Sequence, residues 1–110
     1  MDLYYAARSR AKLQGVCEAM CAAFDLPPFA FDCHDNWSYG RSEGRSIRLN
    51  ITRTSDTHTV ETWMPGCPSG VNYQIILSAK SEPTGFVSRL AEVLGTEVIK
   101  YATSGQEADA

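Results

Sequence analysis

The sequence predicts an α+β domain, with a mainly antiparallel sheet of about five strands and two helices packed on one face, in the order αββββαβ. Apolar residues recur at helical spacing in residues 2–24 and 84–94, which predicts the two helices. Apolar and polar residues alternate in residues 46–53 and 71–79, a pattern typical of strands. Packing both helices on one face of the sheet buries both apolar stripes at once.

The length and charge of the chain limit its organisation and partners. At 110 residues we expect one domain over residues 1–102 and a flexible tail over residues 103–110. A net charge of −3 disfavours nucleic acid as a partner, because a phosphate-binding face is normally basic. No apolar run approaches the roughly 20 residues needed to span a bilayer, and the start lacks a secretion signal. We therefore expect a cytoplasmic protein without membrane contact.

The first predicted helix runs from Asp2 to Phe24, and the prolines at positions 27 and 28 end it. Its apolar stripe consists of Leu13, Val16, Cys17, Met20, Cys21 and Phe24. The second predicted helix, residues 84–94, follows a Ser-Glu-Pro start signal and ends at Gly95. Each stripe is expected to cover part of the sheet.

Five segments are predicted to be strands. They are residues 29–34, 46–53, 57–63, 71–79 and 96–101. The segment 71–79 carries apolar residues on one face and part of the other, which predicts an interior strand. The segment 57–63 is polar and β-branched, so we expect it nearer an edge.

The segment between the first two strands, residues 34–45, is predicted to be a polar loop that carries Trp37 and Tyr39. Large rings close to carboxylates are typical of recognition surfaces, since they give contact area at little entropy cost. The alternative is that both rings tuck back under the hairpin. The sequence leaves both interpretations open.

Signals for catalysis are weak. No serine lies in a strand-turn-helix elbow, and no glycine-rich loop precedes a helix. Cys33 and His34 are neighbours on a strand, so their side chains are expected on opposite faces. The four cysteines are interpreted as reduced, buried apolar thiols rather than metal ligands, because their spacing does not form two close pairs. We expect no enzyme activity, no cofactor and no metal.

Three segments carry a resemblance to a known family. They read FAFDCHDNWSYG, IRLNITR, and PGCPSGVNYQIIL after a tryptophan, followed by a closing helix and strand. Over residues 29–101 the chain resembles small immunity proteins of bacterial polymorphic toxin systems, including contact-dependent growth inhibition. The resemblance implies a cytosolic, monomeric, non-enzymatic protein that binds and neutralises a cognate toxin domain.

A toxin that attacks nucleic acid, such as a nuclease, tends to carry a basic groove, which carboxylates of an inhibitor can fill. The candidate toxin-binding residues, chosen for their chemistry and not fixed by the family, are Asp32, Asp35, Trp37, Tyr39, Glu43 and Glu61. A second candidate surface, which would suit an acidic partner, consists of Arg48, Asn50 and Thr52.

Two other classes of function remain open. A secretion chaperone or small adaptor would bind an effector segment through an apolar patch, usually as a dimer. A thiol enzyme would instead require a cysteine of low pKa, for which Cys33 and Cys67 are the candidates. A monomer that binds a single toxin domain would favour an immunity protein.

Overall fold

The computed structural model describes residues 1–34, 37–56 and 66–104. These residues form six strands and two helices. In chain order they are β1 (Asp2–Ala7), α1 (Leu13–Phe24), β2 (Ala30–His34), β3 (Trp37–Glu43), β4 (Arg48–Thr54), β5 (Tyr73–Ser78), α2 (Phe86–Leu94) and β6 (Ile99–Ser104).

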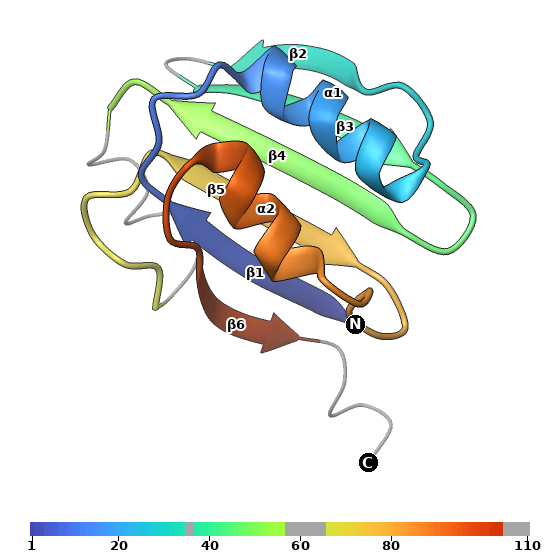
Figure 1. Cartoon of the computed structure of the whole chain (residues 1–110). Coiled ribbons are helices and arrows are strands. Elements are labelled where there is room, and N and C mark those ends of the chain that lie inside the picture. The colour runs from blue at the N-terminus through green and yellow to red at the C-terminus, as the bar shows by residue number, and fades with distance from the viewer. Residues whose placement is uncertain (35–36, 57–65, 105–110) are drawn as a thin grey trace.

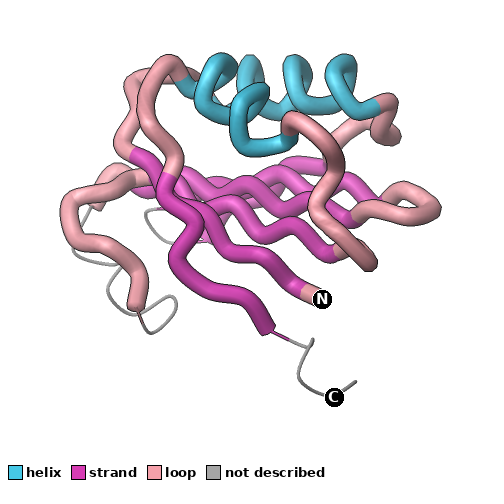
Figure 2. The backbone as a smooth tube through the Cα atoms, turned by 60° about the horizontal axis from the view of Figure 1, so that its bottom comes forward, coloured by secondary structure: helices cyan, strands magenta, loops and turns pink. Residues whose placement is uncertain are grey.

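All six strands belong to one sheet in the order β2-β3-β4-β5-β1-β6, and every neighbouring pair is antiparallel (Figure 1). Both helices lie on the same side of this sheet (Figure 2). The predicted α+β class is confirmed, with six strands where about five were expected. β5 lies between β4 and β1, which confirms that it is an interior strand.

The N-terminal residues differ from the prediction. Asp2–Ala7, which were expected to begin the first helix, form strand β1 between β5 and β6. Leu3 and Tyr5 lie opposite Leu77 and Ile75 of β5 and are buried under the helices. The helix prediction was wrong here because the apolar stripe begins only at α1, whereas the two tyrosines of this segment favour a strand.

Strand β3 also corrects a prediction, because most of residues 34–45 was expected to be a loop. It pairs with β4 along its whole length and with β2 from Trp37 to Arg41. Gly40 and Ser42 of this strand face α1, and the Ser42 hydroxyl donates a hydrogen bond to the carbonyl of Pro27 at 2.7 Å. The larger polar side chains of β3 point to the other face. The segment is therefore polar because one of its faces lacks a helix.

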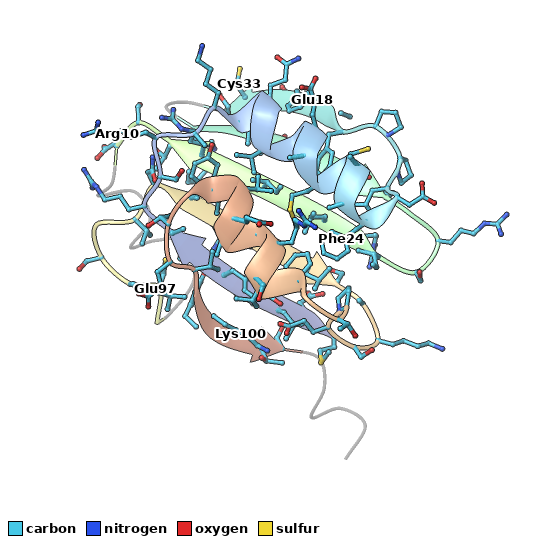
Figure 3. The ribbon with its side chains drawn as sticks, in the orientation of Figure 1. Arg10, Glu18, Phe24, Cys33, Glu97 and Lys100 are labelled. Carbon is cyan, nitrogen blue, oxygen red and sulfur yellow. The ribbon has the colours of Figure 1, made fainter. Side chains whose placement is uncertain are left out.

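The hydrophobic core lies between the helices and the sheet. Its most deeply buried large side chains include Tyr5, Val16, Met20, Leu49, Ile51, Tyr73, Ile75, Leu77, Phe86 and Leu90. The α1 residues Val16, Cys17 and Met20 are buried, which confirms the predicted stripe. The rings of Phe24, labelled in Figure 3, and Phe86 lie 5.3 Å apart between centroids and join the two helices.

Two predicted segments fall partly or wholly outside the described residues. The expected strand at 57–63 lies in the undescribed segment 57–65, and most of the expected tail lies in 105–110. The last strand, predicted at 96–101, is β6, which reaches Ser104. In the described part of the chain, neither helix has the length and apolar character that crossing a membrane requires.

Candidate functional site

The sheet face opposite the two helices, called here the open face, carries most of the predicted site residues. Side chains alternate between the two faces of a strand. A side chain at Gly40 would point at Cys17 of α1, so Trp37, Tyr39 and Glu43 point away from the helices. Asp32 lies opposite Tyr39 across the β2-β3 pair and therefore shares their face.

The strand register aligns the residues of the open face in rows across the sheet. One row runs from β2 to β5 through Asp32, Tyr39, Thr52 and Gln74. The next row runs from β3 to β1 through Arg41, Asn50, Ile76 and Tyr4. Residues directly opposite each other have Cβ atoms about 5 Å apart, so each row brings its side chains into reach of one another.

A hollow of about 450 Å³ lies over these rows. Its lining includes Trp37, Tyr39, Arg41, Asn50 and Ile76. The side chains of Trp37 and Tyr39 are both half-buried, so each ring rests on the sheet and still offers part of its surface to the hollow. The two rings are therefore placed on the open face and not in the core.

Contacts among its own side chains hold the open face in place. Thr52 Oγ1 donates a hydrogen bond to Asn50 Oδ1 at 3.0 Å, and Gln74 Nε2 donates to the Tyr101 hydroxyl at 2.6 Å. The Tyr101 ring also packs against Tyr4, with centroids 6.1 Å apart. Burial raises the pKa of Tyr101 to about 12, so its hydroxyl stays neutral at physiological pH.

The described part of the open face mixes both signs of charge. Glu43 lies opposite Arg48 in the β3-β4 register, and Arg41 lies two residues before Glu43 on β3. Asp32 is exposed and accepts a hydrogen bond from the Cys33 backbone amide at 2.8 Å. Carboxylates and guanidinium groups therefore alternate here, in contrast to the carboxylate patch that the sequence predicts.

The two surfaces that the sequence treats as alternatives lie on one face. Arg48, Asn50 and Thr52 of β4 pair directly with Glu43, Arg41 and Tyr39 of β3, respectively. The other two predicted residues, Asp35 and Glu61, lie outside the described residues.

The cysteines differ in their exposure, which corrects the expectation that all four are buried. Cys17 is buried and Cys33 is exposed, whereas Cys21 and Cys67 are half-buried. Burial raises the pKa of Cys17 to about 12 and also raises the pKa of Cys67, so neither thiol favours the reactive thiolate. Among the residues that the structure describes, no three His, Cys, Asp or Glu side chains gather in a group able to hold a metal ion.

Sequence reasoning missed four contributors to the open face. They are Tyr4, Gln74, Ile76 and Tyr101. Tyr4 was missed because its segment was assigned to a helix. The alternation of buried Leu3, Tyr5 and Ala7 with Asp2 and Tyr4 is the signal that could have placed it.

Comparisons with known proteins identified no relative of this chain. No protein family, curated protein or solved structure was found to match the chain.

Proposed function

We propose that this protein is a cytosolic immunity protein, which binds a cognate toxin domain with its open face and thereby blocks the toxin's active site. The observation that carries the proposal is the composition of that face. Two half-buried rings, Trp37 and Tyr39, stand among carboxylates and arginines contributed by adjacent strands. Aromatic residues and arginine are enriched at protein interfaces, and they supply most of the residues that dominate binding energy.

The extent of the face favours a protein partner over a single small ligand. The row through Arg41, Asn50, Ile76 and Tyr4 crosses four strands. Neighbouring strands lie about 4.8 Å apart, so this row alone spans about 14 Å. A surface of this width suits the centre of a protein interface, which buries about 800 Å² on each partner.

The residues of the open face would contribute to binding in different ways. Trp37 and Tyr39 would act as anchors, because their rings already rest on the sheet and lose little conformational entropy on binding. Asp32 and Glu43 would face basic groups of the toxin, whereas Arg41 would face an acidic group. Such complementary charges speed association and exclude wrong partners. The resemblance to immunity proteins supports a toxin as the partner.

The test begins with the gene upstream of this one. We expect it to encode a large secreted protein with a variable C-terminal domain, and that domain is the partner to purify. The wild-type chain should bind it and inhibit its activity at a molar ratio of one to one. Absence of both binding and inhibition would overturn the proposal.

Variants locate the binding surface. Trp37→Ala and Tyr39→Ala should each weaken binding at least 30-fold, about 2 kcal/mol, measured by isothermal titration calorimetry. Phe31→Ala is the matched control, because Phe31 is an aromatic residue that is 48% exposed and lies on the helix side of β2. Its affinity should stay within threefold of the wild type.

The same variants distinguish an immunity protein from a secretion chaperone or adaptor. Phe31 lies on the edge strand β2, where an extended effector segment could add a strand to the sheet. An adaptor of this kind would lose affinity with Phe31→Ala and keep it with Trp37→Ala. A dimer in solution, measured by sedimentation, would further favour the adaptor.

A further inference from the structure

A second hollow, of about 600 Å³, lies at the end of the sheet where β1 and β4 end and β5 begins. Three arginines line it: Arg8 and Arg10 from the segment between β1 and α1, and Arg53 from β4. Figure 3 shows Arg10 at the periphery of the molecule on this side. Among the described lining residues, none is shared with the hollow on the open face.

Hydrogen bonds fix the backbone that carries these arginines. The Ser9 amide donates to Asn72 Oδ1 at 2.9 Å, and Asn72 Nδ2 donates back to the Ser9 carbonyl at 2.8 Å. Ser9 Oγ donates to the carbonyl of Leu94 at 2.6 Å, and Arg8 Nη1 donates to the carbonyl of Gly70 at 2.8 Å. The segment is therefore tied to the residues just before β5 and to the end of α2 before any ligand arrives.

The side chain of Arg53 packs against the ring of Tyr73. Its guanidinium lies 5.9 Å from the centre of the Tyr73 ring, whose hydroxyl donates to the Ala11 carbonyl at 2.6 Å. The Nε atom of Arg53 is buried and has no hydrogen-bond partner among the described residues. A buried donor without an acceptor is unfavourable. Arg53 as a whole is half-buried and lines the hollow, so an oxyanion bound there would contact the remaining nitrogens of this guanidinium.

Among the residues that the structure describes, no carboxylate is seen to balance the charges of these arginines. In the described part of the chain no carboxylate lines the hollow, and the ion pairs are formed by other residues, Arg89 with Glu92 and Lys100 with Glu82. Asp56 is close in sequence, but it does not line the hollow. Helix α1 begins three residues after Arg10 without an acidic residue in its first turn, so its positive end adds to the local potential.

We propose that this hollow binds a phosphate group, either as free phosphate or as a phosphomonoester. Arginine presents several donors in a planar fork that matches phosphate oxygens, and three guanidinium groups offer more donors than one carboxylate could accept. A phosphate dianion also neutralises more of the positive charge. This site is distinct from the proposed toxin-binding face and its test does not require the toxin.

The test is isothermal titration calorimetry of the whole chain with inorganic phosphate and, separately, with O-phosphoserine, at constant ionic strength. The wild type should bind at least one of them saturably at one site. Binding of inorganic phosphate would show that the phosphate group alone suffices, and binding of O-phosphoserine alone would show that the ligand is an ester. Failure of both probes to saturate would overturn the proposal.

Arginine variants identify which residues bind the phosphate group. Arg10→Gln and Arg53→Gln should each weaken binding at least tenfold, whereas Arg89→Gln, an equal change of charge on α2, should alter it less than twofold. An equal loss with Arg89→Gln would overturn the proposal, since it would show attraction by overall charge only. Arg10 is exposed, so Arg10→Gln tests the site even if Arg53→Gln fails to fold.

Discussion

Gly40 of β3 lies directly beneath Cys17 of α1, so closely that a Cβ atom on Gly40 would stand 2.9 Å from the Cys17 sulfur. The ring of Phe31 on β2 closes the other side, with Cε1 at 3.0 Å from the same position. The absence of a side chain at Gly40 therefore sets how closely the first helix approaches the sheet, and so how much of the core it covers.

Replacing Gly40 by alanine should destabilise the fold by about 1–3 kcal/mol, because the added methyl group must displace Cys17 or Phe31. Urea unfolding followed by circular dichroism measures this change. Gly15→Ala is the matched control: Gly15 is an exposed helical residue with nothing within 4 Å of an added Cβ, so alanine should stabilise the helix by about 1 kcal/mol. Equal effects at both glycines would contradict the close approach.

The buried hydroxyl of Tyr5 donates to Glu82 Oε2 at 2.5 Å, and the Lys100 ammonium donates to the same oxygen at 3.2 Å. The Tyr5 hydrogen bond, followed by Lys100, holds the pKa of Glu82 below its ordinary value of 4.5. A lowered pKa means that this contribution to stability is present above about pH 4.5 and is lost as the pH falls below it.

Tyr5→Phe should therefore lower the free energy of unfolding by about 2 kcal/mol at pH 7, because the hydrogen bond to a charged group is removed. The difference between Tyr5→Phe and the wild type should shrink as urea unfolding is repeated from pH 5 down to pH 3. A difference that stays constant over this range would show that the carboxylate charge does not contribute.

Alkaline conditions should destabilise the protein through its tyrosines. Burial raises the pKa of Tyr73 and of Tyr101 to about 12, from an ordinary value of 10. In the unfolded chain these hydroxyls lose their protons near pH 10, whereas the folded chain retains them, so stability falls as the pH rises from 10 to 12. Urea midpoints measured from pH 9 to 11.5 should fall more steeply for the wild type than for Tyr73→Phe. Parallel curves would contradict the assignment to Tyr73.

The thiols should react in an order set by their exposure. Cys33 is exposed on the edge strand β2, whereas Cys17 is buried and the pKa of its thiol is raised to about 12. Iodoacetamide should therefore label Cys33 first in the folded protein, and it should label Cys17 only at the rate of unfolding. Mass spectrometry of the peptides gives both rates, and Cys33→Ser should remove the fast one. Similar rates at Cys17 and Cys33 would contradict the packing described here.

The sequence predicted the elements whose periodicity is strong and local. The stripe Val16, Cys17 and Met20 fits only a helix and the alternation of Leu49 and Ile51 fits only a strand, so β4 and the part of the predicted first helix that forms α1 were placed correctly. By contrast, Tyr4 and Tyr5 fit either a helix or a strand. The alternation over residues 2–7 favours a strand, but the partners in β5 and β6 that confirm it are non-local, and a single sequence does not show such pairing.

The candidate site was predicted in its residues but not in its arrangement. Trp37 and Tyr39 were selected for their chemistry, but they were assigned to a loop. The structure places them on strand β3, where Trp37 lies opposite Thr54 and Tyr39 lies in a row with Thr52 and Gln74. The basic hollow was not anticipated at all, because Arg10 and Arg53 are 43 positions apart in the chain and converge only through the sheet. Sites assembled from distant segments have no local signal.

The affinity of a charge-reversed open face tests the central claim most directly. Asp32→Lys with Glu43→Lys places two lysines on the open face, and Glu18→Lys with Glu97→Lys makes the same change of charge at exposed residues elsewhere, labelled in Figure 3. If the toxin domain covers the open face, the first pair should weaken binding at least 30-fold, about 2 kcal/mol, and the second pair less than threefold. Equal affinities for the two double variants would show that the partner binds elsewhere.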